Sequence, residues 1–292
     1  MGLSLRHHRI AANGIQIHVA EVGSGPPVVL LHGYPENCYA WRKQWPALAD
    51  RFHVFMPDLR GYGDSDKPAT GYDKRTMAED VLAVVRHFGH SRIALVGHDR
   101  GARLATRLAT RLAKDYRQFV DRLVVMDNTP TRVVFNNTHA KLARQYWFFY
   151  FQQVLDLPEA LVAGMEEIFL RHFYSNWTYD PTAITDADVA EYVRAYSQPG
   201  AFRGAFSDYR AGPQDLAQDI EDADALIDCP VLALWGADFD LVGKAFDVLE
   251  VWRGMTHQVR GAPFAQCGHL PQEEQPEVVN QELLAFRAGW ND

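Results

Sequence analysis

The sequence has few cysteines, no long hydrophobic run near its start and fewer basic than acidic side chains. Its three cysteines, Cys38, Cys229 and Cys267, are odd in number and widely spaced. This spacing argues against a disulfide framework and against a zinc or redox pair, and it favours free thiols in a reducing compartment. The longest aliphatic run near the N-terminus is residues 28–31, and arginines and histidines stand in the first ten residues. We therefore expect neither a secretion signal nor a membrane span, and a cytoplasmic location.

The shortage of positive charge restricts the partners. There are 29 Lys and Arg against 37 Asp and Glu, which gives a formal net charge of −8. Phosphate backbones and anionic membrane surfaces would repel such a chain. We expect no nucleic acid and no membrane as partners, and a small molecule together with water as substrates; a homodimer is compatible with the sequence.

The remaining composition is that of a globular protein. The 292 residues are 47% hydrophobic and 23% charged, which excludes disorder, collagen and coiled coil. At roughly 150 residues per domain the length suits two domains, or one α/β core with an inserted lid. Length alone does not distinguish these arrangements.

Two kinds of periodicity alternate along the chain. Residues 9–22 alternate apolar and polar side chains around Asn13 and Gly14, a dipeptide that suits a type I′ turn, so we expect a β-hairpin. Short apolar runs predict buried strands at residues 28–31, 54–56, 93–96, 123–126 and 231–234. Apolar residues spaced by three and four predict helices at residues 41–48, 76–88 and 100–116. This alternation is typical of an α/β fold with a mostly parallel, doubly wound sheet.

The alternation stops between Asp127 and Cys229. This stretch is rich in aromatics and reads as successive helices without a clear strand, which we interpret as an inserted helical lid. We therefore divide the chain into a first core segment at 1–130, a lid at 131–228 and a second core segment at 229–292. The second core segment ends in a helix at about residues 276–290.

One candidate catalytic motif joins a strand to a helix. Residues 97–101 read GHDRG between the strand at 93–96 and the helix at 100–116. This is the glycine-flanked nucleophile elbow, with Asp99 where esterases carry serine. A carboxylate attacks esters and amides poorly, but it can displace a leaving group from sp³ carbon and form an alkyl ester on the enzyme. The motif therefore argues against lipase and peptidase activity.

Hydrolysis of such an ester requires a base and an acid that orients it. His269 lies in a loop before the last helix, where the chain order nucleophile, acid, histidine puts the base. For the acid, Asp127 follows the strand at 123–126, while Asp238 and Asp240 follow the strand at 231–234. The residues alone leave this choice open.

The oxyanion formed during hydrolysis needs amide donors. We expect one from the Arg100 amide, just past Asp99 at the start of a helix. The second is expected from the Tyr34 amide, in the loop after the strand at 28–31. Removal of one such donor commonly costs about 2.7–4 kcal/mol of transition-state stabilisation.

Three motifs together resemble one branch of a known family. Residues 32–36 (HGYPE), 58–65 (DLRGYGDS) and 97–101 (GHDRG) are similar to the α/β-hydrolases with an aspartate nucleophile, which include epoxide hydrolases and haloalkane and haloacetate dehalogenases. The resemblance spans nearly the whole chain. It implies the α/β-hydrolase fold and a reaction that needs no metal or organic cofactor.

The residues after Asp99 resemble fluoroacetate dehalogenases in particular. In that family two arginines at the positions of Arg100 and Arg103 bind the substrate carboxylate, which is reasonable because two guanidinium groups at i,i+3 can hold a small anion. The resemblance also favours Asp127 as the acid, with Asp240 in reserve. It implies that Tyr209 and Trp177 contact the leaving group.

The sequence departs from that family at Phe148 and Phe149, where the resemblance expects His and Trp. A phenyl ring has no N–H to donate to a departing fluoride, so chloride or bromide is favoured as the leaving group. We therefore predict a hydrolase that displaces halide from a short 2-haloacid.

An epoxide hydrolase is the alternative prediction. The resemblance to that branch implies that Tyr209 with Tyr146 donates to an epoxide oxygen while Asp99 opens the ring. Some epoxide hydrolases that act on carboxylate-bearing epoxides such as trans-epoxysuccinate resemble the same arginine pattern, so Arg100 and Arg103 do not distinguish the two reactions.

Overall fold

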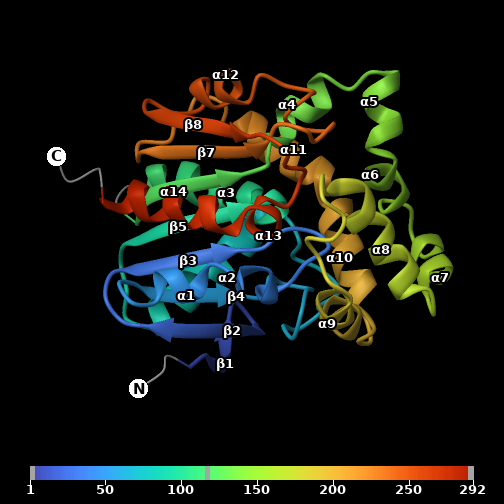
Figure 1. Ribbon diagram of the computed structural model, residues 1–292, viewed down its shortest axis with the longest axis horizontal. Coiled ribbons are helices and arrows are strands. Elements are labelled where there is room, and N and C mark those ends of the chain that lie inside the picture. The colour runs from blue at the N-terminus through green and yellow to red at the C-terminus, as the bar shows by residue number, and fades with distance from the viewer. Residues whose placement is uncertain (1–3, 116–118, 289–292) are drawn as a thin grey trace.

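The core is one eight-stranded sheet with the strand order β1-β2-β4-β3-β5-β6-β7-β8 (Figure 1). The computed structural model describes residues 4–115 and 119–288. The first two strands pair antiparallel with each other, β2 pairs antiparallel with β4, and the other neighbours are parallel. The strands are β1 (Arg6–Ala12), β2 (Ile15–Gly23), β3 (Pro27–Leu31), β4 (His53–Pro57), β5 (Ile93–His98), β6 (Val120–Met126), β7 (Val231–Gly236) and β8 (Val259–Phe264). The predicted mostly parallel α/β sheet is confirmed.

The N-terminal hairpin forms because its turn residues accept left-handed backbone angles. Asn13 has φ 48° and Gly14 has φ 82°, as a type I′ turn requires, and Ala12 pairs with Ile15 across the turn. The predicted hairpin is therefore present, and its second strand joins the sheet through β4.

The eighth strand has no counterpart among the strands that we expected. Its sequence, VRGAPF, lies at the edge of the sheet, and most of its side chains are at least partly exposed. Gly261 packs so close to β7 that an added Cβ would lie 1.9 Å from the Ala233 carbonyl oxygen. Pro263 lacks an N–H, which an edge strand tolerates. Such a segment carries too little hydrophobic signal to be recognised from the sequence.

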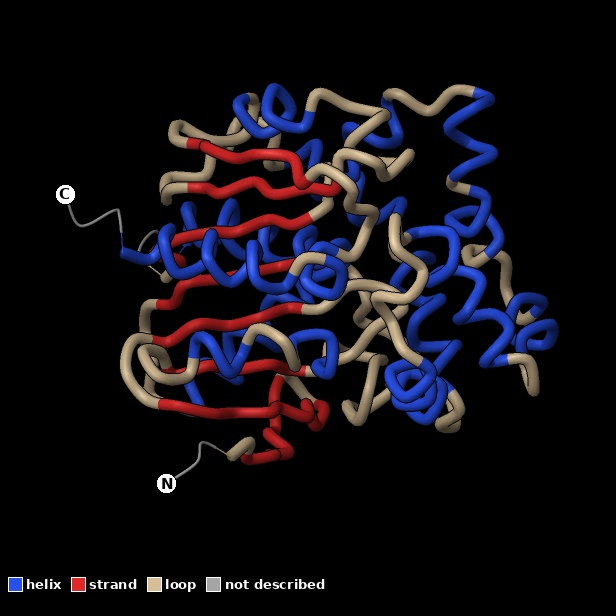
Figure 2. The backbone as a smooth tube through the Cα atoms, in the orientation of Figure 1, coloured by secondary structure: helices blue, strands red, loops and turns tan. Residues whose placement is uncertain are grey.

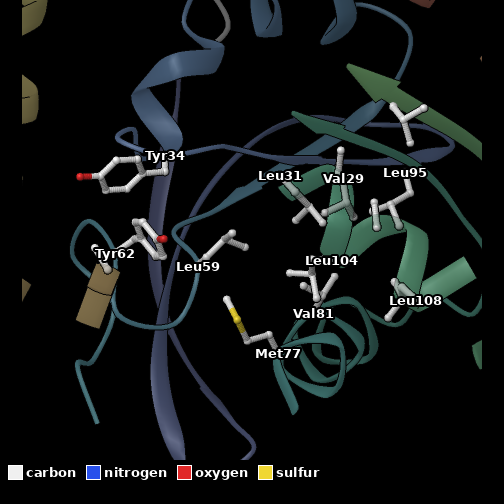
Figure 3. Close-up of a cluster of buried hydrophobic side chains, with 14 of the residues drawn as sticks. Val29, Leu31, Tyr34, Leu59, Tyr62, Met77, Val81, Leu95, Leu104 and Leu108 are labelled. Atoms are coloured by element: carbon white, nitrogen blue, oxygen red, sulfur yellow. The ribbon is translucent and has the colours of Figure 1, made fainter. Parts of the chain in front are cut away.

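Helices cover both faces of the sheet. On one face lie α2 (Lys74–His87) and α3 (Asp99–Asp115), and on the other α1 (Trp45–Leu48) and α14 (Pro276–Ala288) (Figure 1). Figure 3 shows Val29 and Leu31 of β3 with Val81 of α2 and Leu104 of α3 in one core cluster. The alternate residues of β3 join the second cluster with the inner face of α14. The sheet is therefore buried on both faces, as its continuous apolar strands predict.

Short helices complete the core. They are the 3₁₀ helix η1 (Cys38–Trp41), α12 (Val248–Arg253) and α13 (Pro271–Glu274). The predicted helix at 41–48 is thus divided between η1 and α1. The C-terminal ends of two other predicted helices, at 116 and at 289–290, lie outside the described residues.

The stretch between β6 and β7 is helical where the sequence predicts a lid. It holds α4 (Thr131–Asn136), α5 (Ala140–Gln145), α6 (Trp147–Phe151), α7 (Leu157–Val162), α8 (Glu166–Trp177), α9 (Asp186–Tyr196), α10 (Ala201–Arg210) and α11 (Gly212–Glu221). Figures 1 and 2 show most of these helices gathered beyond one end of the sheet, to the right in this view. They lie next to the end where β5 runs into Asp99. Within the described residues, no helix has the length and apolar character to cross a bilayer.

The start of α3 packs so closely on β3 that Gly101 has no room for a side chain. An added Cβ would lie 2.3 Å from the Leu31 carbonyl oxygen and 2.5 Å from that of His32. We predict that Gly101→Ala lowers the free energy of unfolding by roughly 1–3 kcal/mol, because α3 must shift against the sheet. Urea denaturation measures this. The control is Gly254→Ala, where the nearest atom lies at 3.4 Å; equal losses in both variants would contradict the prediction.

Candidate active site

Asp99 stands at a sharp turn between β5 and α3. Its φ of 43° is unusual for a residue with a side chain, and such strain persists only where the surrounding structure enforces it. Gly97 lies just before the turn and close to Ala102. A Cβ added to Gly97 would lie 2.6 Å from the Cα of Ala102. The Asn128 side chain donates to the Asp99 carbonyl at 3.0 Å. This turn holds the Asp99 carboxylate over the end of the sheet.

Asp127 and His269 meet beside Asp99. Asp127 follows β6, and His269 lies in the loop between β8 and α13. The His269 ring donates from Nδ1 to Asp127 Oδ1 at 2.7 Å, and Asp127 Oδ2 accepts from the Gly236 amide at 2.8 Å. His269 Nε2 faces Asp99 Oδ2 at 4.0 Å, within ion-pair distance but too far for a hydrogen bond. The structure thus brings together the three residues that we expected to act as nucleophile, acid and base.

The charges of the two carboxylates dominate the titration of this site. Burial lowers the pKa of His269, but Asp127 and Asp99 outweigh burial and raise it from 6.5 to about 10. Burial likewise raises the pKa of Asp99, but the positive charges of His269 and Arg103 prevail and hold it well below its usual range. The resting site is therefore an imidazolium between two carboxylates.

Two aromatic rings and two backbone contacts fix the orientation of His269. The Phe239 ring stacks on the imidazole with 4.4 Å between centroids, and Trp177 packs edge-on at 4.9 Å. The His269 amide donates to the Trp177 carbonyl at 2.6 Å, and His98 Nε2 donates to the His269 carbonyl at 2.7 Å. Sequence reasoning missed Phe239 and His98. The position of His98 beside Asp99 was the only signal, and Phe239 had none.

The other acid candidates lie away from His269. Asp240 is exposed and pairs with Lys244 at 3.0 Å. Asp238 and Asp240 line an open hollow on the surface. Trp177, Phe239 and Leu241 line both this hollow and the cavity that contains Asp99. The reserve acid Asp240 thus lines the surface hollow and not the cavity of Asp99, and it pairs with Lys244 and not with His269.

One of the two expected oxyanion donors already contacts the nucleophile. The Tyr34 amide donates to Asp99 Oδ2 at 3.1 Å. The Arg100 amide follows Asp99 directly in the first turn of α3, where N–H groups have no intrahelical acceptor. Both residues are buried, and of the two amides the Tyr34 amide is the one with a recorded contact to Asp99.

The expected pair of carboxylate-binding arginines needs a correction. The Arg100 guanidinium is buried against the lid residue Asp208: Nε donates to Oδ2 at 2.9 Å, and Nη2 donates to Oδ1 at 2.6 Å and to the Asp208 carbonyl at 2.8 Å. Lys74 pairs with the same carboxylate, and Arg100 is not among the residues that line the cavity. The sequence could not reveal this, because residue 208 meets residue 100 only through the placement of the lid.

Arg103 does line the cavity. Its Nη1 donates to the Thr131 hydroxyl at 3.2 Å, and its guanidinium carbon lies 5.2 Å from the centre of the Phe149 ring. It is buried, its Nε has no hydrogen-bond partner, and no carboxylate among the described residues pairs with it. Arg103 thus makes no direct ion pair within the described residues, and the nearby Asp99 carboxylate interacts with it only through space.

The rest of the cavity wall is mainly apolar. The cavity is lined by Asp99, His269 and Arg103, with Phe148 and Phe149 on its lid side. Its other apolar side chains are Trp177, Phe239, Leu241 and Val242. The space inside that a water-sized molecule can reach is narrow, about 20 Å³, so the site suits only a small substrate.

The two lid tyrosines differ in position. Tyr146 lines the cavity, but its hydroxyl donates to the Leu241 carbonyl at 3.0 Å. Tyr209 is not a lining residue; its ring packs against Phe149 and lies under the Arg100 guanidinium. No partner for the Tyr209 hydroxyl occurs in the described part of the chain. Of the three expected leaving-group contacts, the structure thus places Trp177 and Tyr146 in the wall and Tyr209 behind it.

One group of side chains has the composition of a metal site. His18, Cys38 and Asp58 bring their ligand atoms within 4.8 Å of one another. Asp58 already accepts from His18 Nδ1 at 2.7 Å and from the Cys38 and Asp64 amides at 2.7 and 2.8 Å. These hydrogen bonds account for the cluster as a brace of the loop after β4. None of the expected site residues belongs to it.

We predict that Asp99→Asn lowers the pKa of His269, because the substitution removes one of the two negative charges that raise it to about 10. The stabilisation of the fold by the imidazolium is complete below about pH 6.5 and is lost as the pH rises toward about 10. NMR titration of ¹⁵N-labelled histidine measures the change. The signal of the exposed His172 is the internal control, and an unchanged His269 titration would contradict the charge argument.

Comparison with known proteins agrees with this geometry. A family model described as alpha/beta hydrolase fold matches residues 26–276. The soluble epoxide hydrolase of Corynebacterium sp. (strain C12) is 36% identical over 99% of this chain and 99% of its own length. A fluoroacetate dehalogenase of Burkholderia sp is 35% identical over 93% of this chain and 90% of its own. An α/β hydrolase of Nostoc sp PCC 7120 is similar in structure, with a TM-score of 0.93, 37% identity and coverage of 98% and 99% of the two chains. The chain therefore belongs to the α/β hydrolase fold family and is a hydrolase.

Proposed function

We propose that the protein displaces halide from a short 2-haloacid through a covalent ester on Asp99. The observation that carries this proposal is the buried Arg103 guanidinium, which lines the same cavity as Asp99 and pairs with no carboxylate in the described part of the chain. An unpaired buried cation is costly, and an anionic substrate compensates it. A carboxylate bound at Arg103 would place the neighbouring carbon toward Asp99.

The first step is a displacement at carbon. An Asp99 oxygen attacks the carbon that bears the halogen, the new C–O bond forms, and the halide leaves with the electron pair of the broken bond. The depressed pKa of Asp99 keeps this carboxylate ionised and ready to attack. Among halides, chloride and bromide suit the apolar wall of Phe148 and Phe149, which offers no donor to fluoride.

The second step is hydrolysis of the ester. Ester formation removes the negative charge of Asp99, which is one cause of the high pKa of His269. The imidazolium can then release its proton, and neutral Nε2 accepts a proton from the attacking water. The Tyr34 amide, which contacts Asp99 Oδ2, and the Arg100 amide would then stabilise the oxyanion that forms on the Asp99 carboxyl group. Its collapse releases the 2-hydroxyacid and restores the carboxylate, so the overall reaction consumes one water and yields halide and one proton. No step needs a metal or an organic cofactor.

Epoxide hydrolysis is the second candidate, and one observation favours it. No hydrogen bond of the Tyr209 hydroxyl is found among the described residues, so it is available to donate to an epoxide oxygen. Tyr146, its expected partner in that reaction, already donates to the Leu241 carbonyl. The Corynebacterium relative carries this activity in its name. Both reactions share the attack by Asp99 and the hydrolysis by His269.

We predict that the protein releases bromide and glycolate in equal amounts from bromoacetate. His269→Ala should release no more than one bromide per chain and retain the carboxymethyl group on the peptide that contains Asp99, because the ester then lacks its base. Ion chromatography and peptide mass spectrometry measure the two results. Asp99→Ala is the control and should give neither product.

Styrene oxide and trans-epoxysuccinate are tested alongside. Diol formation without bromide release would contradict the proposed 2-haloacid substrate and favour epoxide hydrolysis. Turnover without any adduct in His269→Ala would contradict the ester intermediate itself.

We predict that Arg103→Leu raises KM for bromoacetate by roughly 10- to 150-fold, which corresponds to the loss of about 1.5–3 kcal/mol for a charged hydrogen bond. KM for the uncharged analogue bromoacetamide should rise far less, because bromoacetamide has no carboxylate for Arg103 to bind. Steady-state kinetics with both compounds measures the difference. Arg253→Leu, at an exposed arginine of α12, is the matched control. An equal rise in KM for the two compounds would mean that Arg103 stabilises the folded structure and does not bind the substrate carboxylate.

A further inference from the structure

The side chain of Glu274 connects two segments that lie far apart in the sequence. Its Oε1 accepts from the backbone amides of Gly268 at 2.9 Å and Leu270 at 3.3 Å, on either side of the expected base. Its Oε2 accepts from the amides of Tyr179 at 2.7 Å and Asp180 at 3.3 Å, just past the end of α8. One carboxylate therefore joins the loop of the expected base to the end of a lid helix.

The four amides are the main partners of a partly buried negative charge. Burial raises the pKa of the Glu274 carboxyl above its ordinary value, and the amide hydrogen bonds oppose that rise because they favour the ionised form. In the described part of the chain Arg42 and Lys43 pair with the neighbouring Glu273, and no ion pair of Glu274 occurs there. The Cys267 thiol adds only a long contact at 3.9 Å. A carboxylate fixed mainly by backbone groups holds the course of the chain itself.

The two segments that Glu274 joins are also in direct contact. Gly268 packs so closely on the end of α8 that an added Cβ would lie 2.2 Å from the Trp177 carbonyl oxygen and 2.8 Å from the Tyr179 nitrogen. The His269 amide donates to the same Trp177 carbonyl at 2.6 Å, and the Trp177 ring packs edge-on against the imidazole. A shift of the end of α8 would therefore move the imidazole.

The contacts that hold the nucleophile come from other segments. The Asn128 side chain donates to the Asp99 carbonyl, and the Tyr34 amide donates to Asp99 Oδ2. Glu274 contributes to neither contact, and it is not among the residues that line the cavity. Loss of its carboxylate should therefore disturb the base and leave the nucleophile in place.

We propose that Glu274 is a positioning residue for hydrolysis of the ester on Asp99. By joining the loop of His269 to the end of α8, its carboxylate holds the imidazole where Nε2 can take a proton from water. This role rests on the proposed function, because it requires the ester intermediate, but it is the same for a halide and for an epoxide. Glu274 touches no substrate in this scheme and acts only through the position of His269.

The test measures ester formation and ester hydrolysis separately in Glu274→Gln. The glutamine side chain has the same size, but its NH₂ group cannot accept from one of the two pairs of amides. We expect ester hydrolysis to slow by roughly 10- to 100-fold, as a small displacement of a catalytic group can cause. Ester formation should stay within about threefold of the wild type, because the contacts of Asp99 are unchanged.

Rapid-quench mass spectrometry of the peptide that contains Asp99 measures both rates. The substrate is bromoacetate or styrene oxide, whichever the wild type hydrolyses. A lower kcat with an unchanged kcat/KM would show the same division in the steady state, because kcat/KM contains only the steps through ester formation.

Two further variants accompany the test. Glu277→Gln, at an exposed glutamate of α14, is the matched control and should leave both rates unchanged. Glu274→Asp keeps the carboxylate on a side chain that is one carbon shorter, and it should slow ester hydrolysis by a smaller factor than Glu274→Gln. Circular dichroism and thermal unfolding verify that the variants fold.

Two results would overturn the role of Glu274. An equal decrease of both rates would mean that Glu274 stabilises the fold without positioning the base. Unchanged ester hydrolysis in Glu274→Gln, or in Glu274→Asp if the former does not fold, would mean that His269 is held without this carboxylate. A wild type that hydrolyses neither substrate, by contrast, would contradict the proposed function itself.

Discussion

A buried carboxylate from the lid fixes the relation between the lid and the core. Asp208 of α10 accepts hydrogen bonds from Arg100 of α3 and from the Tyr62 hydroxyl, and it pairs with Lys74 of α2. Loss of one member of such a network leaves an uncompensated buried charge, which costs about 3–5 kcal/mol. Because Arg100 directly follows Asp99, the same contact that anchors the lid also braces the turn that carries the nucleophile. The position of the apolar lid wall relative to Asp99 depends on this carboxylate.

This network also explains which parts of the site could be predicted. Asp99 and His269 were predicted from the elbow motif and the chain order of the catalytic residues. The strands alone left Asp127, Asp238 and Asp240 open as the acid, because loops after two strands end at the same side of the sheet, and only the family resemblance favoured Asp127. The partner of Arg100 lies more than a hundred residues away on a separate layer, and nothing in the local sequence distinguishes a guanidinium that binds substrate from one that binds Asp208. Phe239 and the hydrogen bond of Tyr146 to Leu241 likewise arise from tertiary packing.

In the fold as well, some elements are predictable from the local sequence and others depend on contacts with distant residues. The buried strands and the type I′ hairpin carry strong local signals, and these elements form where we expected them. The edge strand β8, with its glycine and proline, becomes a strand because β7 offers it a partner. The helical character of residues 131–221 was predictable from the absence of strands, whereas the boundaries of its short helices depend on aromatic contacts such as those of Phe169 with Phe173 and Phe202.

The low polarity of the cavity connects its electrostatics with its chemistry. Apolar walls leave few water molecules to screen Asp99, His269 and Arg103, so each charge acts strongly on the others. In the proposed mechanism, loss of the Asp99 charge on ester formation would lower the pKa of His269 and supply the neutral imidazole when a base is required. In the proposed scheme this coupling would serve a halide and an epoxide equally, because either reaction leaves an alkyl ester on Asp99: a carboxyalkyl ester from a 2-haloacid and a hydroxyalkyl ester from an epoxide. The difference between the two reactions lies in the donor for the leaving group, where a soft halide needs none and an epoxide oxygen needs a hydroxyl. Phe148 and Phe149 line the cavity and offer no N–H or O–H to a leaving group, which is the reason for our proposal of a halide.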